Sequence, residues 1–166
     1  MIISLSELIN MEKTTLPLKF DISKEEMGKL DEWSFKEAAH LDATIKNVHG
    51  ALVLKGSISA LLQGKCSRCL KDVEISIEVD LDCTLVNGLD ESQEEDVYIY
   101  EDDTLNIQEF IKAYVALELP LQLLCKDDCE GLCHDCGKDL NLGECTCDED
   151  TKPIDPRMEA LKKLLK

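Results

Sequence analysis

Cysteines are the residues of this chain with the clearest capacity for chemistry, since eight of the nine form four closely spaced pairs. Three pairs lie in CKDDCEGLCHDCGKDLNLGECTC, residues 125–147, and the fourth lies in CSRCL, residues 66–70. A structural zinc site takes four thiolate or imidazole ligands, commonly as pairs that a tight turn holds about two to four residues apart. Eight thiols and one left over therefore predict two metal sites, whereas an odd number of cysteines fits a disulfide framework poorly.

The spacing of the pairs also indicates how they combine. The expected metal ligands are Cys66, Cys69, Cys125, Cys129, Cys133, Cys136, Cys145 and Cys147. The last four of these cysteines lie close enough in the chain to enclose one ion. The pair at residues 66–69 is then expected to meet the pair at residues 125–129 around a second ion. Two structural Zn²⁺ ions are the expected cofactors. The spacing also allows four alternatives: a single site with spare thiols, a binuclear cluster, an iron–sulfur cluster, or His134 in place of one cysteine.

Catalysis is not expected from such sites, because a catalytic zinc keeps one coordination position open and takes mostly His and carboxylate ligands. His40, His49 and His134 show no ligand spacing, and no nucleophile elbow or phosphate-binding loop is present. We therefore expect a protein that is not an enzyme. A zinc- or thiol-based regulatory or redox-sensing adaptor is the alternative, although CSRC lacks the βαβ context of a redox motif.

Strands must position the cysteine pairs. Residues 73–85 alternate apolar with acidic or hydroxyl side chains, which predicts a long strand with one buried face. Cys83 falls in the apolar register, so we expect it to pack in the core. Residues 40–48 and 52–62 alternate less regularly, with a hairpin turn expected at NVHG, residues 47–50. Together they predict an antiparallel meander.

Further elements complete an expected α+β fold. Residues 1–5 and 16–22 fit edge strands, and NIQEFIKAYVALELP, residues 106–120, has the apolar stripe of a helix. Asn106 and Glu109 resemble a capping box, and Pro120 ends the helix. This helix is expected to cover a partly closed sheet. The predicted organisation is a core domain at 1–124, a cysteine-rich zinc module at 125–150 and a carboxyl-terminal amphipathic helix at 151–166.

The formal net charge of −17 argues against a surface that binds nucleic acid by neutralising phosphates. A basic protein partner fits this charge better, with the acidic strand face and the acidic segment at residues 89–103 as its contacts. The chain shows neither a secretory signal nor an apolar run of about 20 residues, so we expect a cytoplasmic protein with no membrane contact. No small-molecule substrate is indicated.

Four motifs, in this order, resemble those of the bacterial YceD family, the large ribosomal RNA subunit accumulation proteins. They are CSRCL at 66–70, LELPLQLLC at 117–125, CEGLCHDCGKDLNLGECTC at 129–147 and DPRMEALKKLL at 155–165. The resemblance implies a non-enzymatic factor that supports accumulation of the large-subunit (23S) ribosomal RNA. It assigns the family's cysteines to the eight positions given above. Direct contact with ribosomal RNA stays open, and His134 departs from the proline that many relatives carry there.

Overall fold

The structure is a computed structural model that describes residues 1–88 and 96–147. Its strands are β1 (Ile2–Ser4), β2 (Thr15–Ile22), β3 (Lys29–Leu30), β4 (Trp33–Phe35), β5 (Ala39–Val48), β6 (Ala51–Lys65), β7 (Asp72–Asn87), β8 (Val97–Tyr100) and β9 (Thr104–Asn106). Its helices are α1 (Ser6–Ile9), α2 (Lys24–Met27), α3 (Ile107–Glu118) and a single 3₁₀ turn at Leu140–Leu142. The α+β class, rich in strands and with few helices, is confirmed.

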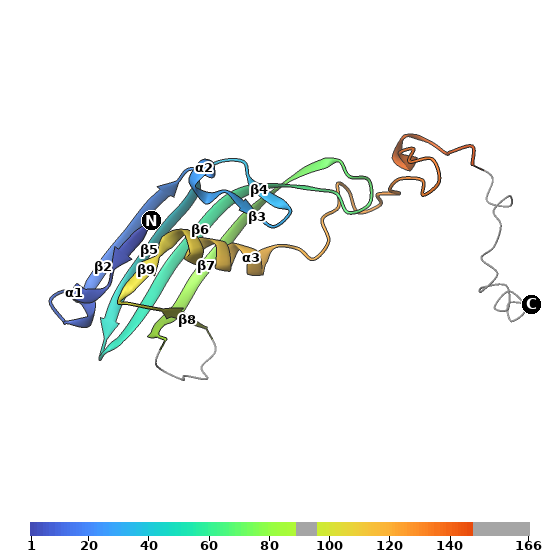
Figure 1. Ribbon diagram of the computed structural model, residues 1–166. Coiled ribbons are helices and arrows are strands. Elements are labelled where there is room, and N and C mark those ends of the chain that lie inside the picture. The colour runs from blue at the N-terminus through green and yellow to red at the C-terminus, as the bar shows by residue number, and fades with distance from the viewer. Residues whose placement is uncertain (89–95, 148–166) are drawn as a thin grey trace, which may run out of the picture.

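A seven-stranded curled sheet forms the body of the molecule (Figure 1). The central strand β6 pairs with β7 from Leu52 to Lys65, and its opposite edge is shared between β5 and the short strand β4. Strand β2 extends the sheet beyond β5, as predicted for an edge strand, and β8 pairs in parallel with the end of β7. The sequential pairing of β5, β6 and β7 is antiparallel, as the sequence predicts.

Two short connections make this order possible. His49 and Gly50 have φ of 54° and 95° and join β5 to β6 in a two-residue turn, the conformation that matches the twist of a hairpin. The turn predicted at residues 47–50 is therefore confirmed. The other connection, between β6 and β7, carries Cys66 and Cys69, so the first cysteine pair lies at the tip of the longest hairpin.

One face of the sheet packs into the core and the other meets solvent. Along β7 the odd-numbered residues from Ile77 to Leu85 are buried, while the even-numbered residues from Asp72 to Asp82 are exposed. Helix α3 lies against β6 and β7 (Figure 1). Its Phe110, Ile111 and Val115 belong to the same buried cluster. The predicted packing role of Cys83 agrees with its 3% exposure in this core.

Two local predictions are wrong. Asn106 occupies the N-cap position of α3, but its side chain makes no capping hydrogen bond and its Oδ1 atom is buried without a hydrogen-bond partner. The amino-terminal strand β1 does not join the main sheet and instead pairs with β9 in a separate two-stranded sheet. The predicted helix at the carboxyl end, within 151–166, lies outside the described residues. None of the helices described at residues 1–88 and 96–147 is both long and apolar enough to cross a membrane.

Candidate metal centres

The turn between β6 and β7 shapes the first cysteine pair. The N–H of Cys66 donates to the carbonyl of Lys71 (2.8 Å), and the N–H of Leu70 donates to the carbonyl of Cys66 (2.9 Å). Leu70 has φ of 60°, so the chain reverses within very few residues. Cys69 lies inside this turn, which brings its sulfur within 4.8 Å of that of Cys66.

The second pair reaches this turn from the segment that follows α3. The N–H of Ser67 donates to the carbonyl of Leu123 (2.8 Å), and Arg68 Nη1 donates to the carbonyl of Cys129 (2.7 Å). These bonds hold Cys125 and Cys129 against the hairpin, although 56 and 63 positions separate the cysteines that meet. The structure thus joins the strand hairpin to the chain after the helix.

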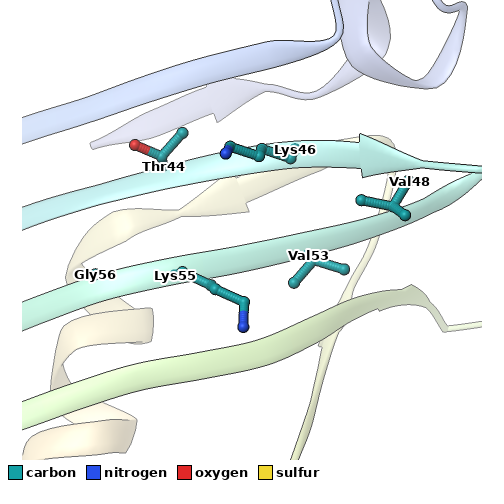
Figure 2. Close-up of a pocket in the computed structure, with 6 residues that line it drawn as sticks. All are labelled: Thr44, Lys46, Val48, Val53, Lys55 and Gly56. Atoms are coloured by element: carbon teal, nitrogen blue, oxygen red, sulfur yellow. The ribbon is translucent and has the colours of Figure 1, made fainter.

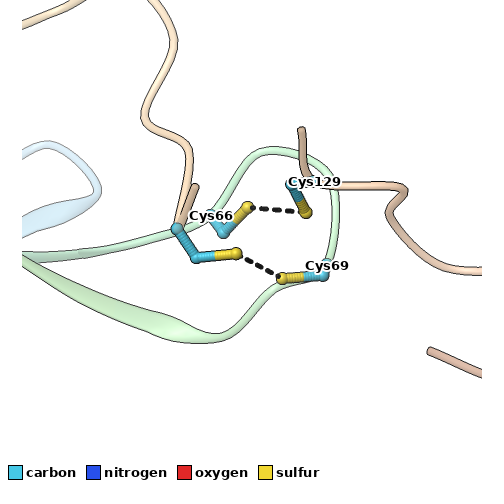
Figure 3. Close-up of side chains that lie close together, drawn as sticks. Cys66, Cys69 and Cys129 are labelled. Atoms are coloured by element: carbon cyan, nitrogen blue, oxygen red, sulfur yellow. Dashed lines mark hydrogen bonds between the residues drawn. The ribbon is translucent and has the colours of Figure 1, made fainter. Parts of the chain in front are cut away.

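The four sulfurs at this place have the separations of a tetrahedral metal site. Cys66 Sγ lies 3.8 Å from Cys129 Sγ, and Cys69 Sγ lies 3.5 Å from Cys125 Sγ (Figure 3). A zinc–sulfur bond of about 2.3 Å in tetrahedral geometry sets neighbouring sulfurs about 3.8 Å apart. A disulfide would need about 2.05 Å, so these thiols are arranged around a point and not bonded in pairs.

Three of the four sulfur ligands of the first site are buried. Cys66, Cys69 and Cys129 are 0%, 5% and 1% exposed and form a small cluster separate from the main core. Val73, Leu124 and Leu132 pack around it. The fourth ligand, Cys125, is exposed, so the site reaches the surface at this sulfur. Four sulfur ligands are the donor set of a structural centre.

The second site repeats the geometry of the first turn. The N–H of Cys133 donates to the carbonyl of Lys138 (2.8 Å), and the N–H of Gly137 donates to the carbonyl of Cys133 (2.8 Å). Gly137 has φ of 71°, in the place where the first turn has Leu70. The sulfurs of Cys133, Cys136, Cys145 and Cys147 lie within 4.8 Å of one another. The two sets of four are those that the spacing of the pairs predicts.

Both turns favour the thiolate at their first cysteine. Burial acts to raise the pKa of Cys66, but backbone N–H groups of Cys69, Arg68 and Cys125 outweigh it and lower this pKa to about 6. Backbone N–H groups of Cys136 and Asp135 likewise lower the pKa of Cys133 to about 6. Aimed N–H groups stabilise a thiolate, and the thiolate is the form that binds metal.

One further thiol in each site has a raised pKa. The side chain of Cys69, followed by burial, raises the pKa of Cys125 to about 12. In the second site the side chain of Cys136 has the same effect on Cys147 and raises its pKa to about 12. Thiolates this close repel one another, so four can ionise together only around a positive charge. A soft divalent cation such as Zn²⁺ fits this donor set.

A bridge of polar side chains connects the two sites. Asp139 Oδ2 pairs with Lys71 Nζ of the first turn (2.7 Å), and this partner, followed by Asn141, lowers the pKa of Asp139 to about 2. Asn141 Nδ2 donates to Asp139 Oδ1 (2.7 Å) and to Cys129 Sγ (3.5 Å), while Asn141 Oδ1 accepts from the N–H of Glu130 (3.0 Å). The loop of the second site therefore supports a ligand of the first.

Sequence reasoning missed this bridge. Asp139 and Asn141 lie in GKDLNLG, residues 137–143. Their types and spacing are typical of a turn, which is all that the local sequence indicates about them. Their contact with Cys129 depends on how the two sites dock, which no local spacing encodes. Arg68, between the first two cysteines, was missed for the same reason.

His134 lies beside the second site without being required by it. Its side chain is 72% exposed, and its Nε2 atom lies 3.5 Å from Asp135 Oδ2. His134, Asp135 and Cys133 also bring possible ligand atoms within 4.8 Å. Four sulfurs complete the second set without the imidazole, so the geometry favours the cysteine-only assignment.

A shallow hollow on the solvent face of β5 and β6 has different chemistry (Figure 2). Thr44, Lys46, Val48, Val53, Lys55 and Gly56 line it. Lys55 Nζ is engaged by Asp82 Oδ2 at 2.7 Å. A Cβ atom at Gly56 would stand 2.3 Å from Ala43 Cα, so the close approach of the two strands requires glycine here. The lining offers ammonium groups and a hydroxyl, and we assign it no reaction.

The fold and its sites define a class: a strand-rich α+β protein with two four-cysteine centres at one end. The family model described as "Large ribosomal RNA subunit accumulation protein YceD" matches residues 54–165. The chain belongs to the YceD family. The match begins within β6 and includes all eight paired cysteines, so the resemblance seen in the sequence motifs is confirmed.

Curated relatives support the same grouping. "Uncharacterized protein YlbN" of Bacillus subtilis is 36% identical over 113 residues, which are 66% of this chain and 64% of the relative. "Uncharacterized protein Rv2926c" of Mycobacterium tuberculosis is 35% identical over 104 residues, 60% of this chain and 50% of the relative. The chain thus spans between half and just under two thirds of the length of these relatives. No solved structure gives a significant match.

Proposed function

We propose that this chain is a non-enzymatic cytoplasmic factor that supports accumulation of the large-subunit (23S) ribosomal RNA. The observation that carries the proposal is the family match over residues 54–165, which covers both cysteine centres. Ribosome synthesis or assembly is the process in which such a factor acts. The two centres hold structural zinc in this proposal.

Charge supports action through a protein and not through bare RNA. Glu74, Glu78, Asp80 and Asp82 are exposed on the solvent face of β7, in a chain with a net charge of −17. Phosphate binding requires clustered Lys and Arg, so this face would repel RNA. A basic ribosomal protein or assembly factor is attracted to the same face. The acidic row then occupies the basic surface of that partner in place of RNA.

Zinc has a folding role in this proposal. Between residues 125 and 147 the large apolar residues are few, and one of them, Leu142, is 77% exposed. Such a segment cannot support itself by a hydrophobic core. Because the metal binds the folded arrangement and not the unfolded chain, its binding free energy becomes folding free energy. All-sulfur coordination also supports a structural role over a catalytic one.

The test pairs a cellular measurement with a binding measurement. A Bacillus subtilis strain without its YlbN relative receives this chain or its Cys66→Ser/Cys133→Ser variant, and the ratio of 23S to 16S ribosomal RNA is measured. We expect the chain to raise the ratio and the variant not to. The immobilised chain should also bind one or more proteins from a purified large-subunit protein mixture, with binding lost at high salt. Tight binding of bare 23S RNA with no bound protein would refute the protein-contact mechanism.

A further inference from the structure

The outer edge of β7 is open over most of its length. Its inner edge pairs with β6 from Asp72 to Leu85, but on the outer side β8 pairs only with Thr84 to Asn87. Within residues 1–88 and 96–147, no other strand and no loop hydrogen bond reaches the outer edge between residues 72 and 82. A strand edge of this kind presents a row of unpaired N–H and C=O groups that a further strand can use.

The pairing of β8 shows which residues present these groups. The N–H of Thr84 donates outward to the carbonyl of Asp96 (3.0 Å), and the N–H of Gly88 donates outward to the carbonyl of Tyr100 (3.0 Å). Backbone groups alternate sides along a strand, so the even-numbered residues from 74 to 82 also point outward. The same residues have their side chains on the solvent face.

Side-chain chemistry at this edge selects its occupant. Of the outward-facing residues in this row, only Ser76 is not acidic. Asp82 is paired with Lys55 and Glu74 with Lys36, whereas no ion pair within the described part of the chain involves Glu78 or Asp80. Like charges directly opposite one another destabilise strand pairing, so a second copy of β7 is repelled. A strand with Lys or Arg at alternate positions meets these carboxylates across the pair.

The intervening residues restrict the other face of that strand. Ile77, Val79 and Leu81 are buried, and Val73 and Ile75 are half-buried on the core side. A partner strand therefore places apolar side chains on that side and basic ones on the solvent side. A segment that pairs with β7 as a strand needs this alternation of basic and apolar side chains. A disordered basic tail held by charge alone does not need it.

We propose that the open edge of β7, from Glu74 to Asp82, binds an extended basic segment of a protein partner by adding it to the sheet as a further strand. This inference rests on the proposed function, because it specifies how the acidic face holds a basic partner. Backbone hydrogen bonds supply the binding energy, and the acidic row supplies the preference for Lys and Arg. The curved sheet thereby gains a strand in line with β8.

The experiment uses the full chain loaded with zinc and a synthetic seven-residue peptide of alternating Lys and Val. Amide hydrogen exchange is followed by NMR. The peptide should slow exchange at Ser76, Glu78 and Asp80 by at least about tenfold and leave the odd-numbered amides, which face β6, unchanged. The same peptide N-methylated on alternate residues keeps its charge but loses the donors, and it should give no such protection. Equal protection by both peptides, or by neither, would overturn strand addition.

Two sets of variants distinguish the contribution of the strand edge to peptide binding from the contribution of the acidic side chains. Ser76→Pro removes one outward N–H without touching the β6 ladder, a change that an edge strand tolerates. Glu78→Gln/Asp80→Asn removes charge and keeps the edge, and Asp31→Asn/Glu32→Gln removes the same charge in an exposed turn elsewhere. Both β7 variants should weaken peptide binding about tenfold or more, and the control should not. Thermal unfolding verifies that each variant is folded.

Failure of strand addition and failure of the proposed function give different results. A Ser76→Pro variant that is folded and binds large-subunit proteins as the wild type does would overturn strand addition and leave the proposed function standing. Protection of the β7 edge by the peptide, with no large-subunit protein bound by the wild-type chain, would support strand addition and count against the proposed function.

Discussion

Replacing Asn141 by alanine should weaken metal binding at a site to which Asn141 does not belong. Asn141 Nδ2 lies 3.5 Å from Cys129 Sγ, and Asn141 Oδ1 accepts from the N–H of Glu130 at 3.0 Å. The alanine variant loses both bonds to the first site. A net value of about 1 kcal/mol for each bond gives about 2 kcal/mol. That corresponds to about a thirtyfold loss, within the roughly 10- to 100-fold cost known for partners of metal ligands.

The assay is the rate of zinc transfer to a colorimetric chelator. Asn141→Ala is made in the chain with both sites intact, because the second turn must stay folded to hold Asn141 against Cys129. The zinc of the first site is identified as the part of the release that the Cys66→Ser variant lacks. Gln122→Ala is the matched control, because it removes an exposed amide nearby for which the structure shows no hydrogen bond. Asn141→Asp should also release zinc from the first site faster than the wild type does, because aspartate keeps an acceptor but loses the donor to Cys129. Unchanged zinc release in Asn141→Ala would refute the bridge.

Three further predictions concern the metal and the sheet. Native mass spectrometry of chain purified without chelator should show two zinc ions, and Cys66→Ser and Cys133→Ser should each leave one; a single ion, lost only in Cys133→Ser, would make the first pair free thiols. Removal of zinc should speed amide exchange first in the segment after α3, because few apolar residues hold it, and unchanged exchange there would contradict a structural role. Gly56→Val should lower the free energy of unfolding by about 2 to 4 kcal/mol, since its Cβ would stand 2.3 Å from Ala43 Cα, and a denaturant titration measures this loss.

Patterns that act over a few residues made much of this molecule predictable. The alternation from Val73 to Leu85 gave the strand β7 and its buried face, because burial imposes a period of two along a strand. The pairing of cysteines gave two groups of four, because a short turn limits how far apart two sulfurs of a pair can lie. The turn at His49 and Gly50 was visible for the same local reason.

Contacts between distant segments were not predictable in this way. The bond from Asn141 to Cys129 exists only because the second turn docks against the first, and sequence spacing does not encode that docking. The strand at Ile2–Ser4 was recognised as a strand, but its partner β9 lies about a hundred residues away. The capping hydrogen bond expected from Asn106 is absent, and its Oδ1 atom is buried without a hydrogen-bond partner. The open edge of β7 could be seen only once its neighbours were placed.

The different lengths of chain enclosed by the two centres set an order for their assembly. Cys66 and Cys129 are 63 positions apart, so the first centre closes only after β7, β8, β9 and α3 have been arranged between its two halves. Cys133 and Cys147 are 14 positions apart. Closing the longer loop costs about 1.3 kcal/mol more in chain entropy, roughly a factor of ten in probability. We therefore expect a refolding chain supplied with metal to close the second centre, from Cys133 to Cys147, before the tip of the β6–β7 hairpin docks against it.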